Sequence, residues 1–250
     1  MVEMQNRTSW NKVSRWYDKQ VGDKGHYYHE HVIIPGIKKI IDWDSSKSLL
    51  DLACGQGVLG REWPGNKYLG IDVASNLIAE ARLRDKNNQH KYQIGDVTKK
   101  LKLEEKFDEA IIILAFQNLN NPAMVIKNIR ENLTDRGKLL LVINHPAFRV
   151  PKHSDWIVKN WRQFRMVDNY MSPLEIPIES RPFDKVDNQT TYSFHYPLSM
   201  ISQMLFDNGL VIEKIEEWIS DKKSEGSMAK IENKARKEIP LFMAILAMVK

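Results

Sequence analysis

Two aspartates close short apolar runs and are placed to bind the same ligand. Asp51 lies within Ser48–Ala53, and Asp72 ends Tyr68–Asp72. Both segments are predicted to be buried strands. Carboxylates on successive strand ends suit a ligand that carries an ammonium and a vicinal diol better than one that carries a pyrophosphate, because carboxylates accept hydrogen bonds and repel phosphate. A third acid, Asp96, follows another such run and would lie on the same edge of a sheet.

A glycine turn lies between the first strand and the next helix. Gly55, Gly57 and Gly60 match a dinucleotide fingerprint, and residues without Cβ let a ligand approach the backbone. This match alone leaves an NAD(P)-dependent oxidoreductase open. However, Asp51 occupies a strand position that is usually apolar in dehydrogenases, and no tyrosine is followed four residues later by the lysine that a short-chain enzyme would use.

Two histidines are candidates for a general base. His145 follows the fifth strand directly, and His195 lies just before Pro197, where the chain returns to the same sheet edge. Histidine titrates near neutral pH and could take a proton from a hydroxyl group, or each ring could simply bind the backbone. Three arginines of the following segment could hold an acidic group or pair with neighbouring aspartates: Arg149, Arg162 and Arg165.

The elements that position these residues alternate between strand and helix. This alternation predicts an α/β fold with a doubly wound, mostly parallel seven-stranded sheet. A Pro- and aromatic-rich segment after strand five predicts an inserted cap with one helix near residues 155–164. The expected units are N-terminal lid helices at 1–47, a cofactor-binding core at 48–144, the cap at 145–196 and the rest of the core sheet at 197–250.

The motifs Asp51–Gly57, Gly70–Asp72 and Gly95–Val97 together resemble those of the class I S-adenosylmethionine-dependent methyltransferases. The resemblance is good over residues 48–144 and extends to the quinone-biosynthesis and small-molecule branch of that family. It implies that an antiparallel C-terminal hairpin closes the sheet. It also implies S-adenosylmethionine as the cofactor and an enzyme that methylates a small-molecule nucleophile. Oxygen is preferred over nitrogen or carbon because of the two histidines.

The resemblance also implies a role for each motif residue. Asp51 would face the methionine ammonium, Asp72 would accept both ribose hydroxyls, and Asp96 would accept from the adenine amino group. Tyr17 and His26 of the leading segment would belong to a lid over the cofactor. The other implied cofactor-binding residues are backbone or apolar positions along the cofactor: Ala53, Gly55, Gly57, Val73, Val97, Ala115 and Phe116.

The composition indicates which partners, metals and compartments to expect. The net charge of +5 is mild and its lysines are scattered, so nucleic acid is an unexpected partner, although an RNA methyltransferase or a non-catalytic cofactor-binding protein remains possible. Cys54 is the single cysteine, which excludes an internal disulfide and a cysteine-based zinc site, and no metal is expected. Without a visible signal peptide or a membrane-spanning run, we expect a cytoplasmic protein.

Overall fold

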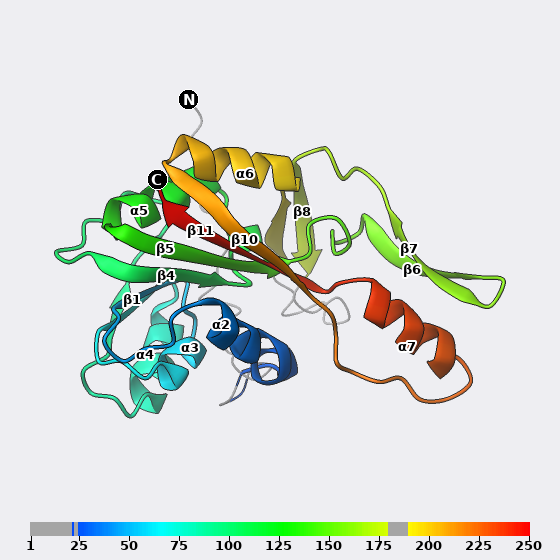
Figure 1. The fold of residues 1–250 in the computed structure, drawn as a ribbon, viewed down its shortest axis with the longest axis horizontal. Coiled ribbons are helices and arrows are strands. Elements are labelled where there is room, and N and C mark those ends of the chain that lie inside the picture. Colours follow the sequence, from blue (N-terminus) through cyan, green and yellow to red (C-terminus); the bar gives the residue numbers. More distant parts are fainter. Residues whose placement is uncertain (1–21, 23–24, 180–189) are drawn as a thin grey trace.

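A seven-stranded sheet forms the centre of the molecule (Figure 1). The computed structural model describes residues 22, 25–179 and 190–250. Strand order across the sheet is β10-β11-β5-β4-β1-β2-β3. Neighbours from β5 to β3 pair in parallel, whereas β11 pairs antiparallel with both β5 and β10. The predicted fold class is therefore confirmed. Its strands are β1 (Leu49–Leu52), β2 (Tyr68–Asp72), β3 (Lys91–Ile94), β4 (Phe107–Ile113), β5 (Leu133–Asn144), β10 (Leu210–Trp218) and β11 (Phe242–Val249).

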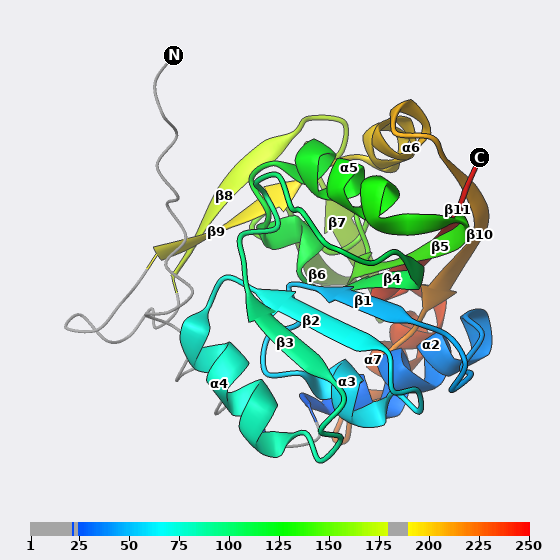
Figure 2. The same ribbon diagram turned by 90° about the vertical axis from the view of Figure 1, so that its left-hand side faces the viewer.

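Helices cover both faces of this sheet (Figures 1 and 2). One face carries α5 (Pro122–Asn132) and α6 (Leu198–Asp207), and the other carries α2 (Ile34–Ile40), α3 (Val58–Glu62) and α4 (Ser75–Arg84). The π-helical turn η1 (His29–Ile33) leads into α2. Because successive strand residues point to opposite faces, β4 sends Ala110 and Ile112 into one apolar core and Ile111 into the other.

Helices α5 and α4 have different residues at their N-caps. The Asn121 side chain accepts a hydrogen bond from the Met124 amide at the start of α5, as an N-cap residue should. At the start of α4, Ala74 is the N-cap residue, and its amide donates to the Asp72 carboxylate.

The segment after β5 contains two antiparallel hairpins rather than the helix expected near residues 155–164. The strands of the first, β6 (Ser154–Lys159) and β7 (Arg162–Val167), project from the molecule (Figure 1). Asn160 and Trp161 join them, both with positive φ, as in a two-residue hairpin turn whose twist matches that of the strands. The second hairpin pairs β8 (Leu174–Glu179) with β9 (Thr190–His195).

The chain between β10 and β11 includes helix α7 (Ala229–Glu238). Residues 1–21 and 23–24 of the expected lid segment, Tyr17 among them, lie outside the described residues. No described helix is long and apolar enough to cross a membrane.

Candidate active site

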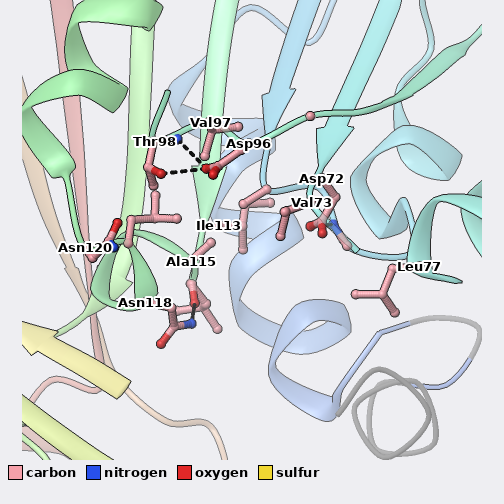
Figure 3. A pocket seen from close by; sticks show the side chains of 15 residues that line it. Asp72, Val73, Leu77, Asp96, Val97, Thr98, Ile113, Ala115, Asn118 and Asn120 are labelled. Atoms are coloured by element: carbon pink, nitrogen blue, oxygen red, sulfur yellow. Dashed lines mark hydrogen bonds between the residues drawn. The ribbon is translucent and has the colours of Figure 1, made fainter. Parts of the chain in front are cut away.

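A cavity of about 790 Å³, including its opening to solvent, lies at the carboxyl ends of β1, β2, β3 and β4. This is where open α/β sheets bind their ligands. Figure 3 shows acidic and apolar side chains from these strand ends converging on one space. The sequence-predicted residues in its wall are Ala53, Gly55, Asp72, Val73, Asp96, Val97 and Ala115.

The chain turns sharply where it leaves β1. Ala53, Gly55 and Gly57 all have positive φ, a conformation that costs a residue with a Cβ about 1–2 kcal/mol. A Cβ on Gly57 would also lie 2.8 Å from the Tyr92 hydroxyl, so only glycine fits there. Gly57 begins α3 and shapes the turn without lining the cavity. Ala53 and Gly55 remain in the wall with their backbone exposed to a ligand.

Asp72 connects this turn to the end of β2. Its carboxylate accepts hydrogen bonds from the Gly55 amide at 2.9 Å and the Ala74 amide at 2.8 Å. Burial raises the pKa of Asp72, while these amide hydrogen bonds act in the opposite direction. Each carboxylate oxygen can accept more than one hydrogen bond, so acceptor capacity remains for a ligand beside Val73.

Asp96 lies on the opposite side of the cavity, after β3. One of its oxygens accepts from the Thr98 amide at 3.0 Å and the Thr98 hydroxyl at 2.6 Å (Figure 3). The other oxygen is 3.7 Å from the exposed Lys99 ammonium. Asn128 of α5 fixes this loop by donating to the carbonyls of Val97 and Lys99. Sequence reasoning missed Thr98 and Asn128, because a lone Thr or Asn carries no motif.

Asp51 lines a narrower cavity that shares Ala53 and Ile113 with the first. The Tyr68 hydroxyl donates to Asp51 at 2.7 Å, and burial raises the pKa of Asp51 to about 7. Two buried nitrogens in the same wall have no hydrogen-bond partner among the described residues: Nδ1 of His29 and Nε2 of Gln56. Unpaired polar atoms at this depth cost about 1–3 kcal/mol each, which favours a polar ligand. No sequence motif marks Gln56.

A third cavity lies across the short 3₁₀ turn η2 (Phe116–Asn118). Ala115 and Asn118 line the first cavity, whereas Phe116 and Gln117 line the third. Phe116 is fully buried, with its ring 6.3 Å from that of Tyr196. The structure therefore separates two residues that were both expected along the cofactor.

His145 and His195 both line the third cavity, but their hydrogen bonds differ. His145 accepts from the Ala147 amide at Nδ1, so Nε2 carries the hydrogen and donates to Glu217 at 2.6 Å. Nε2 of His195 lies 2.7 Å from the Tyr170 carbonyl oxygen and must be the donor, which leaves the lone pair on Nδ1. Burial lowers the pKa of both rings, so both are mainly neutral at pH 7. Of these two rings, only that of His195 keeps a nitrogen without a hydrogen bond to any described residue.

Other expected site features lie away from these cavities. His26 lines none of the three, although its ring lies 5.6 Å from that of Tyr28. Among the described residues, no group of three or more His, Cys, Asp or Glu side chains could hold a metal ion.

Comparison with known proteins identifies the core that holds the first cavity. Residues 50–139 match the family described as "Methyltransferase domain". The match covers 90 of the 250 residues. Together with the fold, it confirms the predicted resemblance to class I S-adenosylmethionine-dependent methyltransferases.

A curated relative matches part of this chain. A malonyl-[acyl-carrier protein] O-methyltransferase from Bacillus cereus is 29% identical over 124 residues, which is 48% of this chain and 46% of the relative. The match thus spans about half of each protein.

Solved structures share the fold over most of the chain. An S-adenosylmethionine dependent methyltransferase from Mesorhizobium loti is 21% identical, with a TM-score of 0.70 over 91% of this chain and all of that one. The glycopeptide N-methyltransferase MtfA, solved with S-adenosyl-L-homocysteine, is 15% identical, with a TM-score of 0.55 over 87% of this chain and 85% of that one.

Proposed function

We propose that this chain transfers a methyl group from S-adenosylmethionine to a small-molecule nucleophile, with oxygen preferred over nitrogen or carbon. The observation that carries the proposal is the arrangement of Asp72 and Asp96 on opposite sides of one cavity at the strand ends of a methyltransferase domain. The match to an O-methyltransferase, although it spans half of each protein, supports oxygen.

The walls of the first cavity suit a nucleoside. Val73, Leu77 and Val97 provide apolar surface for a flat base. Asp72 would accept from ribose hydroxyls, and the second oxygen of Asp96 would accept from the adenine amino group. Gly55 and Ala53 bring the backbone close enough to contact the sugar and the adjoining chain.

The narrower cavity suits an α-amino acid end. The Asp51 carboxylate would bind an ammonium, and the Gln56 side-chain amide would donate to a carboxylate, which would satisfy its unpaired nitrogen. Nδ1 of His29 would contribute a third polar contact. A nucleoside pocket that shares two wall residues with an amino-acid pocket fits S-adenosylmethionine, which carries both groups.

The protein's part in catalysis would be positioning and proton transfer. S-adenosylmethionine, when bound, supplies a methyl group on a sulfonium that is open to in-line attack. Holding the reactants in line can account for about 7–11 kcal/mol of the barrier. His195, with its free Nδ1, would accept the proton of an acceptor hydroxyl, whereas His145 would stabilise the loop after β5 through Ala147 and Glu217.

The direct test is to follow the methyl group. The protein is incubated with S-adenosylmethionine carrying a ¹³C-labelled methyl group and with separate small-molecule and RNA fractions of a cell extract. New O-methyl signals in the small-molecule fraction, absent with Asp72→Asn, support the proposal. Label in RNA would favour an RNA methyltransferase, and no transfer despite cofactor binding would favour a non-catalytic binding protein; either result contradicts the proposal.

A further inference from the structure

The third cavity contains an arginine whose charge has no acidic partner. Arg149 lines this space, which measures about 400 Å³ including its opening, beside His195 and Phe116. No Asp or Glu is among its described lining residues. Within the described parts of the chain, no carboxylate forms an ion pair with Arg149 either. Because both histidines are mainly neutral at pH 7, Arg149 gives the cavity its charge.

The guanidinium group of Arg149 is held in place by neutral contacts. Its Nε donates to the Pro240 carbonyl at 3.2 Å, and one terminal nitrogen donates to the Ile239 carbonyl at 3.5 Å. Its carbon lies 5.2 Å from the centre of the Trp156 ring. These contacts fix the plane of the group but do not neutralise it, and they leave donor hydrogens for a ligand.

An unpaired cation in a partly desolvated site is costly unless a ligand brings the opposite charge. Burial, together with the nearby Arg165, lowers the pKa of Arg149 to about 10, which agrees with a cation that lacks a counter-ion. The planar fork of arginine matches a carboxylate in two parallel hydrogen bonds. Apolar side chains surround this position and would contact a hydrocarbon or aromatic body: Phe116, Ile143, Val150, Phe194, Tyr196 and Ile201.

We propose that the third cavity binds the methyl acceptor, and that the acceptor is a small hydroxy acid whose carboxylate is held by Arg149. This inference rests on the proposed function. The acceptor oxygen forms the new bond to the methyl carbon, the carbon–sulfur bond breaks with its electron pair on sulfur, and the hydroxyl proton passes to Nδ1 of His195. The carboxylate stays ionised on Arg149 throughout, so this residue selects the acceptor.

Calorimetric titration with matched acids and amides tests this proposal. The probes are 4-hydroxybenzoate, salicylate and 4-hydroxyphenylacetate, their neutral amides, and phenyl phosphate, each titrated into protein saturated with S-adenosylhomocysteine. We expect at least one acid to bind about tenfold or more tightly than its amide. Arg149→Gln should remove that preference, and Arg149→Lys should restore part of it.

Arg165→Gln is the matched control. Arg165 lies 5.2 Å from the same Trp156 ring, but it does not line the cavity, so the preference should persist in this variant. The affinity for S-adenosylhomocysteine shows whether each variant is folded and tests the proposed function separately. If wild-type protein does not bind S-adenosylhomocysteine, the proposed function fails.

If it binds but no acid is preferred over its amide, or if Arg149→Gln folds and keeps the preference, only the acceptor proposal is wrong. Preference for phenyl phosphate without preference for any carboxylate would overturn the assigned acid class.

Discussion

If Asp51 binds the ammonium group of the cofactor as proposed, cofactor binding should depend on pH. The Asp51 pKa of about 7 in the free protein results from burial, and a ligand ammonium would favour the ionised form. Below pH 7 the carboxyl group must lose a proton before it can bind that ammonium. The Kd for S-adenosylhomocysteine should therefore rise by up to about tenfold per pH unit as the pH falls below 7.

Calorimetry at several pH values checks this expectation. The carboxyl and thiol groups packed around Asp51 belong to Asp72 and Cys54, and its hydrogen-bond donor is Tyr68. His29 has a pKa of about 4 and stays neutral over the same range. Asp51→Asn should bind more weakly with a flat profile. An unchanged slope in this variant would show that another group is responsible.

His195 should affect turnover rather than cofactor binding. His195→Gln removes the nitrogen assigned as the base, so kcat should fall by about 10²- to 10⁴-fold, with the Kd for S-adenosylhomocysteine nearly unchanged. His145→Gln changes a ring that is already hydrogen-bonded to Ala147 and Glu217. It should lower the free energy of unfolding, and its effect on kcat should be smaller than that of His195→Gln. Full activity of His195→Gln would contradict the assignment.

Sequence reasoning found the residues that stand in motifs at strand ends. Asp72 and Asp96 could be placed because a strand followed by a glycine or helix start defines one edge of a parallel sheet. His29 and Gln56 could not, because their unpaired nitrogens depend on how η1 packs against the turn after β1. The difference between His145 and His195 likewise depends on partners from distant segments, Glu217 and Tyr170.

At the scale of elements, β4 contains a buried acid that weakens the fold at high pH. Burial raises the pKa of Glu109 to about 8 despite its strand partner Lys138, and Oε2 has no partner among the described residues. The folded state thus holds a proton that the unfolded chain releases near pH 4.3. Stability from this group is present below that pH and is lost as the pH rises through about 8.

Glu109→Gln mimics the protonated acid at every pH. At pH near 8 it should raise the free energy of unfolding by on the order of 1–3 kcal/mol, and the gain should vanish near pH 4. Urea unfolding at both pH values measures the difference. Glu104→Gln, an exposed change in the preceding loop, should have little effect. An equal gain at both pH values would contradict a titrating Glu109.

The core elements could be predicted from the sequence and the inserted ones could not. Runs such as Ala110–Ile113 are apolar on both faces because helices cover both sides of the sheet, and this gives a strong local signal. The hairpin of β6 and β7 depends on the positive φ angles of Asn160 and Trp161. Neither residue is glycine, so no glycine marks this turn in the sequence. Helix α7 contacts β7, so its buried side is recognisable only once that hairpin is known.

At the scale of the whole molecule, the three cavities would bind different ligands or different parts of one ligand. Adjacent pockets on one side of η2 suit the two ends of the cofactor, and the pocket across η2 suits the acceptor. The fold could be predicted from strand and helix alternation alone. The acceptor could not, because this scaffold serves many substrates and the segment after β5, which contributes much of the third cavity, follows no shared pattern.

Calorimetric titration with S-adenosylmethionine and, separately, with NAD tests the central claim most directly. Wild-type protein and Asp135→Asn, an exposed change outside the three cavities, should bind S-adenosylmethionine with similar Kd values and should not bind NAD. Asp72→Asn should weaken S-adenosylmethionine binding by about tenfold or more, because it replaces a carboxylate acceptor with an amide. Binding of NAD alone, or S-adenosylmethionine binding unaffected by Asp72→Asn, would contradict the account.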